Sequence, residues 1–170
     1  MSLTAEESVA ALLDAWNARD LDRFAGMLHE AVEWYDLGMP HPPMRGRAQV
    51  KAFAEATLRA FPDFKYEILP PLCVAPDGSR CTVLWRITAT HSAMLTPPGF
   101  APTGRTASFE GINLVDFRDG EIVRILTLFD PIAAGEQFLG MRLRPPPGSL
   151  REWLVVRVQR VMAFFARRRR

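Results

Sequence analysis

The sequence has few of the residues that build metal centres and disulfide frameworks. Among its 170 residues are two cysteines and three histidines, and the histidines lack the close spacing of metal ligands. Cys73 and Cys81 flank a Pro-Asp-Gly turn, and Met1 to Ser8 has no basic start or apolar run. We therefore expect no metal site, buried free thiols, and a cytoplasmic location.

The net charge is small, but charged residues are unevenly distributed. The net charge is +2, yet residues 142–170 hold nine arginines and one acid, Glu152, which gives +8 and leaves −6 for residues 1–141. The hydrophobic content of 48% is enough for one domain with a core, and excludes a disordered or fibrous chain. We expect an acidic body at residues 1–141, a Pro-rich linker at residues 142–148, and a basic tail at residues 149–170.

Helical patterns come first in the body. A capping box at Thr4 and apolar residues at helical spacing predict a helix from about Ala5 to about Ala18. Asp20 is placed to cap a short second helix that carries Leu28, and a third helix is expected over residues 48–60. Between them, residues 31–36 read as a short strand, followed by a Pro-rich loop at residues 39–43.

Strand patterns fill the rest of the body. Alternating apolar residues predict strands over residues 65–75, 80–91, 105–118 and 121–129, separated by turns or a Pro-rich loop. This order predicts an α+β fold: a cone-shaped, curved antiparallel sheet with three N-terminal helices that enclose a pocket, and a C-terminal helical extension. Such concave apolar cavities bind small molecules.

Asp130 ends the last predicted strand and precedes Pro131. If it shares the cavity-facing side with Leu126 and Leu128, apolar surroundings would raise its pKa towards neutrality, which suits a general acid or base. The alternative is structural, because an Asp before a Pro commonly begins a helix.

Seven short segments together resemble a known family. They are WNARDLDRF, GRAQVKAF, AFPDFKYEI, RITATHS, PTGR, DGEIV and LFD, and the resemblance spans residues 5–141. The sequence resembles the SnoaL-like polyketide cyclases of the nuclear transport factor 2-like superfamily. This resemblance implies a cone fold, a homodimer, and an aspartate that closes a ring by intramolecular aldol chemistry without metal or cofactor.

The resemblance also implies roles for particular residues. It places the acid and base on Asp130, with His91 and Asn113 as the donors that stabilise an enolate. The related ketosteroid isomerases would instead place the base near Asp36, with Asn113 near their oxyanion donor. The ligand would be a small hydrophobic carbonyl compound, and the candidate binding residues are Trp34, Tyr35, Trp85, Phe109, Leu126 and Leu128. A non-catalytic binding or scaffolding domain is the alternative from another functional class.

The tail lies outside the resemblance. A second capping box at Ser149 predicts a helix over residues 150–166, and the arginines within it argue against a membrane span. Its aromatic residues and the arginine cluster at residues 167–170 fit peripheral contact with an anionic inner membrane. The slightly favoured alternative is packing on the body or on a second subunit. Nucleic acid is disfavoured, because the body offers no aromatic stacking platform.

Overall fold

The computed structural model describes residues 3–38, 43–96 and 98–167, so most of the predicted loop at residues 39–43 lies outside the described residues. The chain divides into two units, Met1–Gly140 and Met141–Arg170. The described residues form five helices and six strands, which confirms the predicted α+β class.

Local sequence signals explain where the helices of the first unit begin and end. The capping box at Thr4 starts α1 (Ala5–Asn17), and Asp20 caps α2 (Leu21–Gly26). Helix α3 spans Gly46–Ala60, and α4 spans Pro131–Leu139. Leu28, expected in the second helix, instead begins a strand and is fully buried there, because α2 ends at Gly26.

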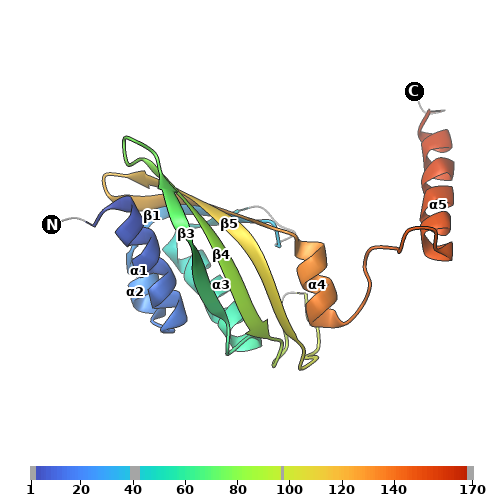
Figure 1. The fold of residues 1–170 in the computed structure, drawn as a ribbon, viewed down its shortest axis with the longest axis horizontal. Coiled ribbons are helices and arrows are strands. Elements are labelled where there is room, and N and C mark those ends of the chain that lie inside the picture. Colours follow the sequence, from blue (N-terminus) through green and yellow to red (C-terminus); the bar gives the residue numbers. More distant parts are fainter. Residues whose placement is uncertain (1–2, 39–42, 97, 168–170) are drawn as a thin grey trace. The chain divides into compact units, whose positions relative to one another are not determined.

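One six-stranded sheet carries the first unit (Figure 1). Its strands are β1 (Leu28–Asp36), β2 (Met44–Arg45), β3 (Lys65–Val74), β4 (Arg80–Thr90), β5 (Thr106–Arg118) and β6 (Glu121–Phe129). Their order is β2-β1-β6-β5-β4-β3. All neighbouring strands are antiparallel except β1 and β6, which are parallel. These two strands are far apart in the sequence, because the chain forms the β3–β5 meander between them.

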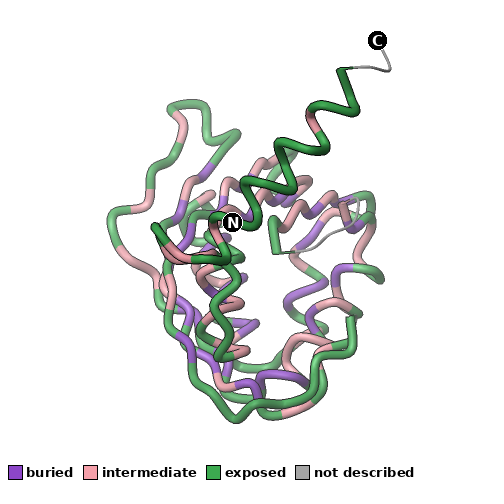
Figure 2. The backbone as a smooth tube through the Cα atoms, turned by 90° about the vertical axis from the view of Figure 1, so that its right-hand side faces the viewer, coloured by how far each residue is buried: buried purple, intermediate pink, exposed green. Residues whose placement is uncertain are grey.

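The helices cover one face of this sheet, and the core lies between them. Helix α1 packs on β3 and β4, whereas α3 packs on β1. Alternate strand residues face this core, as in the run Cys81, Val83, Trp85, Ile87 and Ala89 of β4. Figure 2 shows the buried residues in purple along the backbone. Cys81 is buried as expected, but Cys73 is exposed because it lies on the opposite face of β3; both thiols are free.

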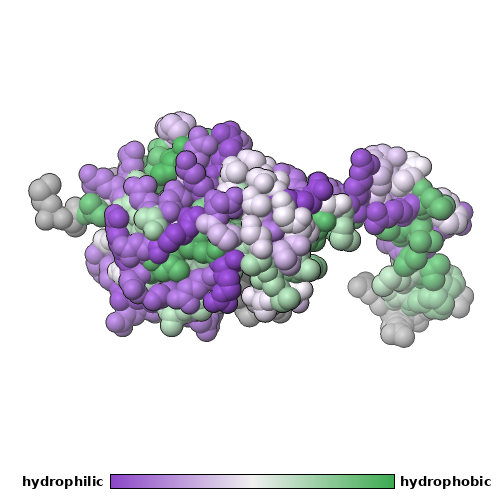
Figure 3. Space-filling view, turned by 90° about the horizontal axis from the view of Figure 1, so that it is seen from below, coloured by the Kyte–Doolittle hydropathy of each residue, from purple (hydrophilic) through white to green (hydrophobic). Residues whose placement is uncertain are grey.

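The second unit contains helix α5 (Leu150–Arg167). Its large apolar side chains are exposed, from Leu150 to Phe165, and they form the apolar surface visible on this helix in Figure 3. The Arg157 guanidinium lies 4.9 Å from the centroid of the Trp153 ring. Among the described residues, no helix is long and apolar enough to cross a membrane.

Gly111 allows the largest buried ring of the sheet to lie against the backbone of β5. A Cβ atom at Gly111 would lie 2.3 Å from Trp85 Cη2 and 2.6 Å from the Leu128 carbonyl oxygen. Trp85 is fully buried and its indole Nε1 donates to Asn113 Oδ1, so moving the ring away from an added Cβ would disturb this hydrogen bond. Gly111 is therefore a packing requirement of the sheet.

We predict that Gly111→Ala lowers the free energy of unfolding by about 2 kcal/mol or more, because the added methyl group overpacks the core. Gly26→Ala is the matched control: a Cβ at Gly26 meets nothing within 4 Å, so this change should be neutral or slightly stabilising. Urea unfolding of both variants measures the difference. Equal stability of the two variants would contradict the packing role of Gly111.

Candidate functional site

The interior of the first unit holds a cavity of about 450 Å³, a size typical of small-molecule sites. Residues of α1, α3 and α4 and of the inward sheet face line it, together with the loop after β4. Most of the lining is aromatic or aliphatic: Trp16, Phe53, Phe61, Phe64, Tyr66, Trp85, Ile87, Leu95, Phe100, Phe109, Phe129, Phe138 and Leu139.

Asp36 is the carboxylic acid of this lining. It ends β1 on the same inward face as Trp34, two residues earlier, and pairs with Thr127 of β6. Burial raises the pKa of Asp36 from 3.8 to about 6, although the backbone N–H of Gly38 donates to Oδ1 at 2.8 Å and opposes the shift. Asp36 is thus a half-buried carboxylate whose pKa is raised well above that of an ordinary aspartate.

Tyr66 lines the same cavity from β3. Burial raises the pKa of its phenol far above the ordinary value, and the negative charge of Asp36 raises it further. The hydroxyl therefore keeps its proton over the physiological pH range and can donate a hydrogen bond. Asp36 and Tyr66 both line the cavity, and they are close enough for the charge of Asp36 to act on the phenol.

A buried hydrogen-bond network supports the wall behind Asp36. The indole Nε1 of Trp34 donates to Thr127 Oγ1 at 2.9 Å, and this hydroxyl donates to Asn113 Oδ1 at 2.9 Å. Trp85 Nε1 donates to the same Asn113 oxygen, also at 2.9 Å. The Asn113 carbonyl oxygen is thus occupied within the sheet, and Asn113 is not among the described residues that line the cavity.

Two other lining residues carry buried polar atoms without a partner. Trp16 and His91 are each only 1% exposed. Among the described residues, neither Trp16 Nε1 nor His91 Nε2 has a hydrogen-bond partner. Such atoms are rare in folded proteins, and each needs a physical explanation.

Asp130 lies at the start of a helix, as the structural alternative predicted. It is the N-cap of α4, and its Oδ1 accepts hydrogen bonds from the backbone N–H groups of Ile132 at 3.1 Å and Ala133 at 2.9 Å. Asp130 is exposed. Its neighbours Phe129 and Pro131 are among the described residues that line the cavity, but Asp130 itself is not. The predicted orientation into the cavity thus differs from the observed one, because the α4 amides hold the carboxylate.

The predicted binding residues divide between the two faces of the sheet. Trp85 and Phe109 line the cavity, whereas Trp34 is buried in the core beside it. Leu126 and Leu128 do share a face with Asp130, but it is the outer one, because Ile125, Thr127 and Phe129 take the inward positions of β6. Tyr35 also lies on the outer face, where Arg124 stacks over its ring at 5.2 Å.

The sequence predicts Asp36 as the base only in the ketosteroid isomerase-like alternative, and it does not predict Tyr66 or Trp16 as site residues. The alternation in β1 contained the signal for Asp36, because it shares a face with the apolar Val32 and Trp34. Nothing comparable marks Tyr66 and Trp16, since aromatic residues at these spacings are ordinary core residues. Their polar atoms become distinctive only once the cavity is known.

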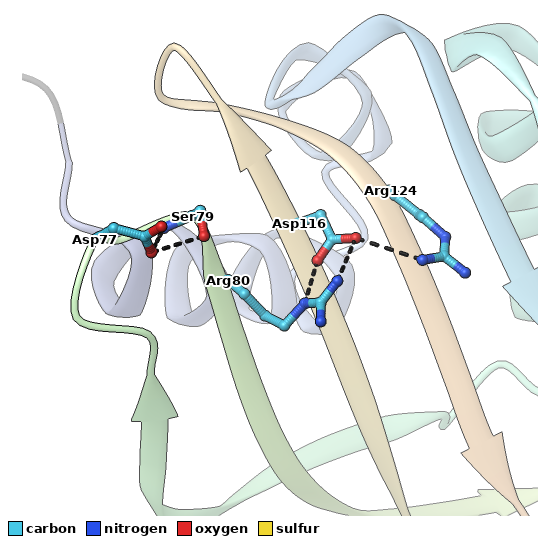
Figure 4. Close-up of polar contacts among 5 residues, drawn as sticks. All are labelled: Asp77, Ser79, Arg80, Asp116 and Arg124. Atoms are coloured by element: carbon cyan, nitrogen blue, oxygen red, sulfur yellow. Dashed lines mark hydrogen bonds and ion pairs between the residues drawn. The ribbon is translucent and has the colours of Figure 1, made fainter.

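A second hollow, of about 930 Å³, opens near the β3–β4 turn and carries charged side chains. There Asp116 Oδ1 accepts from Arg80 Nε at 2.5 Å, and Asp116 Oδ2 lies 3.5 Å from Arg124 Nη1 (Figure 4). In this hollow the Asp116 carboxylate is therefore already paired with two arginines. Within the described part of the chain, no group of three or more His, Cys, Asp or Glu residues could hold a metal ion.

Comparisons with known proteins agree with this architecture. A candidate polyketide cyclase from Pseudomonas putida is 23% identical, with a TM-score of 0.69, over 80% of this chain and 98% of that one. A candidate SnoaL-like polyketide cyclase from Jannaschia sp. is 19% identical, with a TM-score of 0.70, over 83% and 93% of the two chains. IdmH from Streptomyces antibioticus, also a candidate polyketide cyclase, is 24% identical, with a TM-score of 0.66, over 81% and 99%.

These likenesses to solved structures show the fold. Among curated protein sequences, none matches this chain. The family model of the SnoaL-like domain matches residues 9–125, which is more than half of the sequence and includes α2, α3 and strands β1 to β5, but not α4. The chain therefore belongs to the SnoaL-like domain family.

Proposed function

We propose that this protein is a cyclase or isomerase that moves a proton on a hydrophobic, polyketide-like carbonyl compound, with Asp36 as the acid and base. The observation that carries the proposal is a carboxyl group inside an apolar cavity, with its pKa raised to about 6 by burial. A base that titrates near the working pH is suited to proton transfer. The similar structures named as candidate polyketide cyclases support the substrate class.

The proposed step is removal of a proton from the carbon next to the carbonyl group. Asp36 takes this proton as a carboxylate, the C–H electron pair forms the enolate, and the protonated Asp36 then returns the proton to another atom or to the ring-closed product. The Tyr66 phenol, kept protonated by burial and by Asp36, is suited to stabilise the enolate oxygen. The protein thus supplies both the base and the hydrogen-bond donor for this step.

This assignment moves the chemistry from Asp130 to Asp36. Asp130 already serves the α4 amides from an exposed position, whereas Asp36 lines the cavity. The position of Asp36 after the first strand favours the isomerase-like arrangement of the base. Of the two predicted donors, His91 lines the cavity, whereas Asn113 does not, and the Asn113 oxygen accepts bonds from Trp85 and Thr127.

We predict that Asp36→Asn slows proton exchange at least about 100-fold, because the amide cannot take up the proton. The measurement is deuterium incorporation next to the carbonyl of 2-tetralone in D₂O, followed by proton NMR. For the wild-type protein, the rate should rise with pH through an apparent pKa of about 6.

Asp130→Asn is the matched control, because asparagine caps a helix about as well as aspartate. It should retain both stability and exchange. Loss of exchange in Asp130→Asn together with normal exchange in Asp36→Asn would return the chemistry to Asp130. No exchange above the buffer rate in the wild-type protein, for 2-tetralone and for 1,3-diketones, would favour the binding-only alternative.

The raised pKa of Asp36 also predicts a dependence of stability on pH. Because the folded pKa of about 6 lies above the ordinary 3.8, folding favours the protonated acid, and this contribution to stability is lost as the pH rises from about 4 to 6. Asp36→Asn should therefore raise the free energy of unfolding by about 2 kcal/mol at pH 8 and by almost nothing at pH 4. Urea unfolding across this range measures the difference; a gain independent of pH would contradict the raised pKa.

We also propose that the outer sheet face pairs with a second copy of this chain. Leu84, Ile112 and Leu128 are cross-strand neighbours there, and Leu84 and Ile112 are 40% and 37% exposed. Ion pairs border this apolar row, with Arg86 between Glu67 and Glu110 on one side. An apolar patch bordered by charges of both signs is suited to a self-complementary two-fold interface.

We predict that Ile112→Lys abolishes this dimer, because it places an unpaired charge at the centre of the patch. Sedimentation should give the wild-type protein twice the 19.1 kDa monomer mass and the variant the monomer mass. Met94→Lys is the control, since Met94 is 57% exposed in the loop after β4, away from the outer face. A dimer that survives Ile112→Lys would refute this interface.

A further inference from the structure

Two lining residues of the cavity carry polar atoms without partners, and these atoms indicate which polar groups a ligand should have. Trp16 Nε1 and His91 Nε2 are both buried, both belong to lining residues, and both lack partners among the described residues. A buried polar atom without a hydrogen bond is costly, so a ligand that supplies both bonds gains affinity at both positions.

Trp16 needs an acceptor. The indole nitrogen carries a hydrogen and no available lone pair, so it only donates. The ring lies 5.7 Å from the Tyr66 ring, centroid to centroid, at the end of the cavity where Asp36 acts on Tyr66. A ligand carbonyl oxygen at this end would satisfy Trp16.

His91 needs a donor in the tautomer that the hydrogen bonds around Thr103 favour. The Thr103 hydroxyl has one hydrogen, which it donates to the Phe138 carbonyl oxygen at 2.5 Å. Thr103 Oγ1 also lies 3.5 Å from His91 Nδ1 and can only accept there, which favours the tautomer with the ring hydrogen on Nδ1. In that tautomer Nε2 is an acceptor, and it has no donor among the described residues.

The two positions lie at different levels of the cavity. Tyr66, beside Trp16, pairs with Ile87 of β4, and His91 follows four residues later, about 13 Å along the strand. Aromatic rings line the space between them. Phe61 lies 5.3 Å from the His91 ring, and Phe109 and Phe129 lie 5.3 Å apart, centroid to centroid.

We propose that the cavity selects a flat, aromatic ketone that also carries a hydroxyl group at its far end, with the carbonyl accepting from Trp16 and the hydroxyl donating to His91. The Trp16 and His91 side chains are thus specificity-determining residues that read the order of acceptor and donor along the ligand. This inference rests on the proposed use of the cavity as the substrate site, but it does not depend on proton transfer by Asp36.

The test compares matched ligands that each lack one polar group. The long series is 4-acetyl-4′-hydroxybiphenyl, 4-acetylbiphenyl and 4-hydroxybiphenyl, and the short series is 6-hydroxy-1-tetralone, 1-tetralone and 5,6,7,8-tetrahydro-2-naphthol. Titration calorimetry measures each dissociation constant with the full-length protein. In at least one series, we expect the ligand with both groups to bind about tenfold more tightly than either partner.

Two variants assign each preference to its residue. Trp16→Phe should remove the preference for the ketone and keep that for the hydroxyl, and His91→Phe should do the reverse. Equal binding of all three ligands to the wild-type protein in both series, or no binding at all, would overturn the inference. The inference would also be overturned if each variant weakened the binding of all three ligands of a series equally, because Trp16 and His91 would then only shape the cavity.

The comparison on the wild-type protein needs no variant, so it stands even if Trp16→Phe fails to fold. The outcome also separates the two proposals. Proton exchange without discrimination between the ligands would overturn this inference alone. Discrimination without proton exchange would overturn the assignment of Asp36 and leave this inference intact.

Discussion

The burial of the Asp36 carboxylate among aromatic side chains is the constraint on which the account of this molecule depends. The curved sheet and its helices create an apolar cavity, and the inward alternation of β1 places one acid inside it. Desolvation raises the pKa of that acid to about 6, and its negative charge helps to keep Tyr66 protonated. Acid, base and donor properties thus follow from the position of one carboxyl group.

The rest of the first unit holds this arrangement in place. Asn113 gathers the indole of Trp85 and the hydroxyl of Thr127, and Thr127 in turn binds the indole of Trp34, so the wall behind the acid is fixed by directional bonds. Gly111 leaves room for Trp85 against the sheet. Asp130 fixes the start of α4, whose side chains close one side of the cavity. The residue first suspected of catalysis therefore helps to build the site.

The fold could be predicted from the sequence because its signals are local. Capping boxes, strand alternation and the Asp-Gly turn determine the elements, and the family resemblance determines their arrangement. The site was harder to predict because period-two alternation does not reveal which face of a strand is inward. Leu126 and Leu128 are as apolar as Ile125 and Phe129, and only the parallel pairing of β1 with β6 decides between them. The tautomer of His91 depends on Thr103 and Phe138, contacts that no sequence pattern shows.

Contact of α5 with a membrane or with another protein surface is a separate prediction. The central claim concerns the cavity, and the most direct test of it is the ionisation of Asp36 itself. Carbon-13 NMR of the aspartate side-chain carboxyl groups, with Asp36→Asn to assign the signal, measures this pKa as the pH is varied. The account predicts a midpoint near 6, and a midpoint at or below the ordinary 3.8 would contradict it.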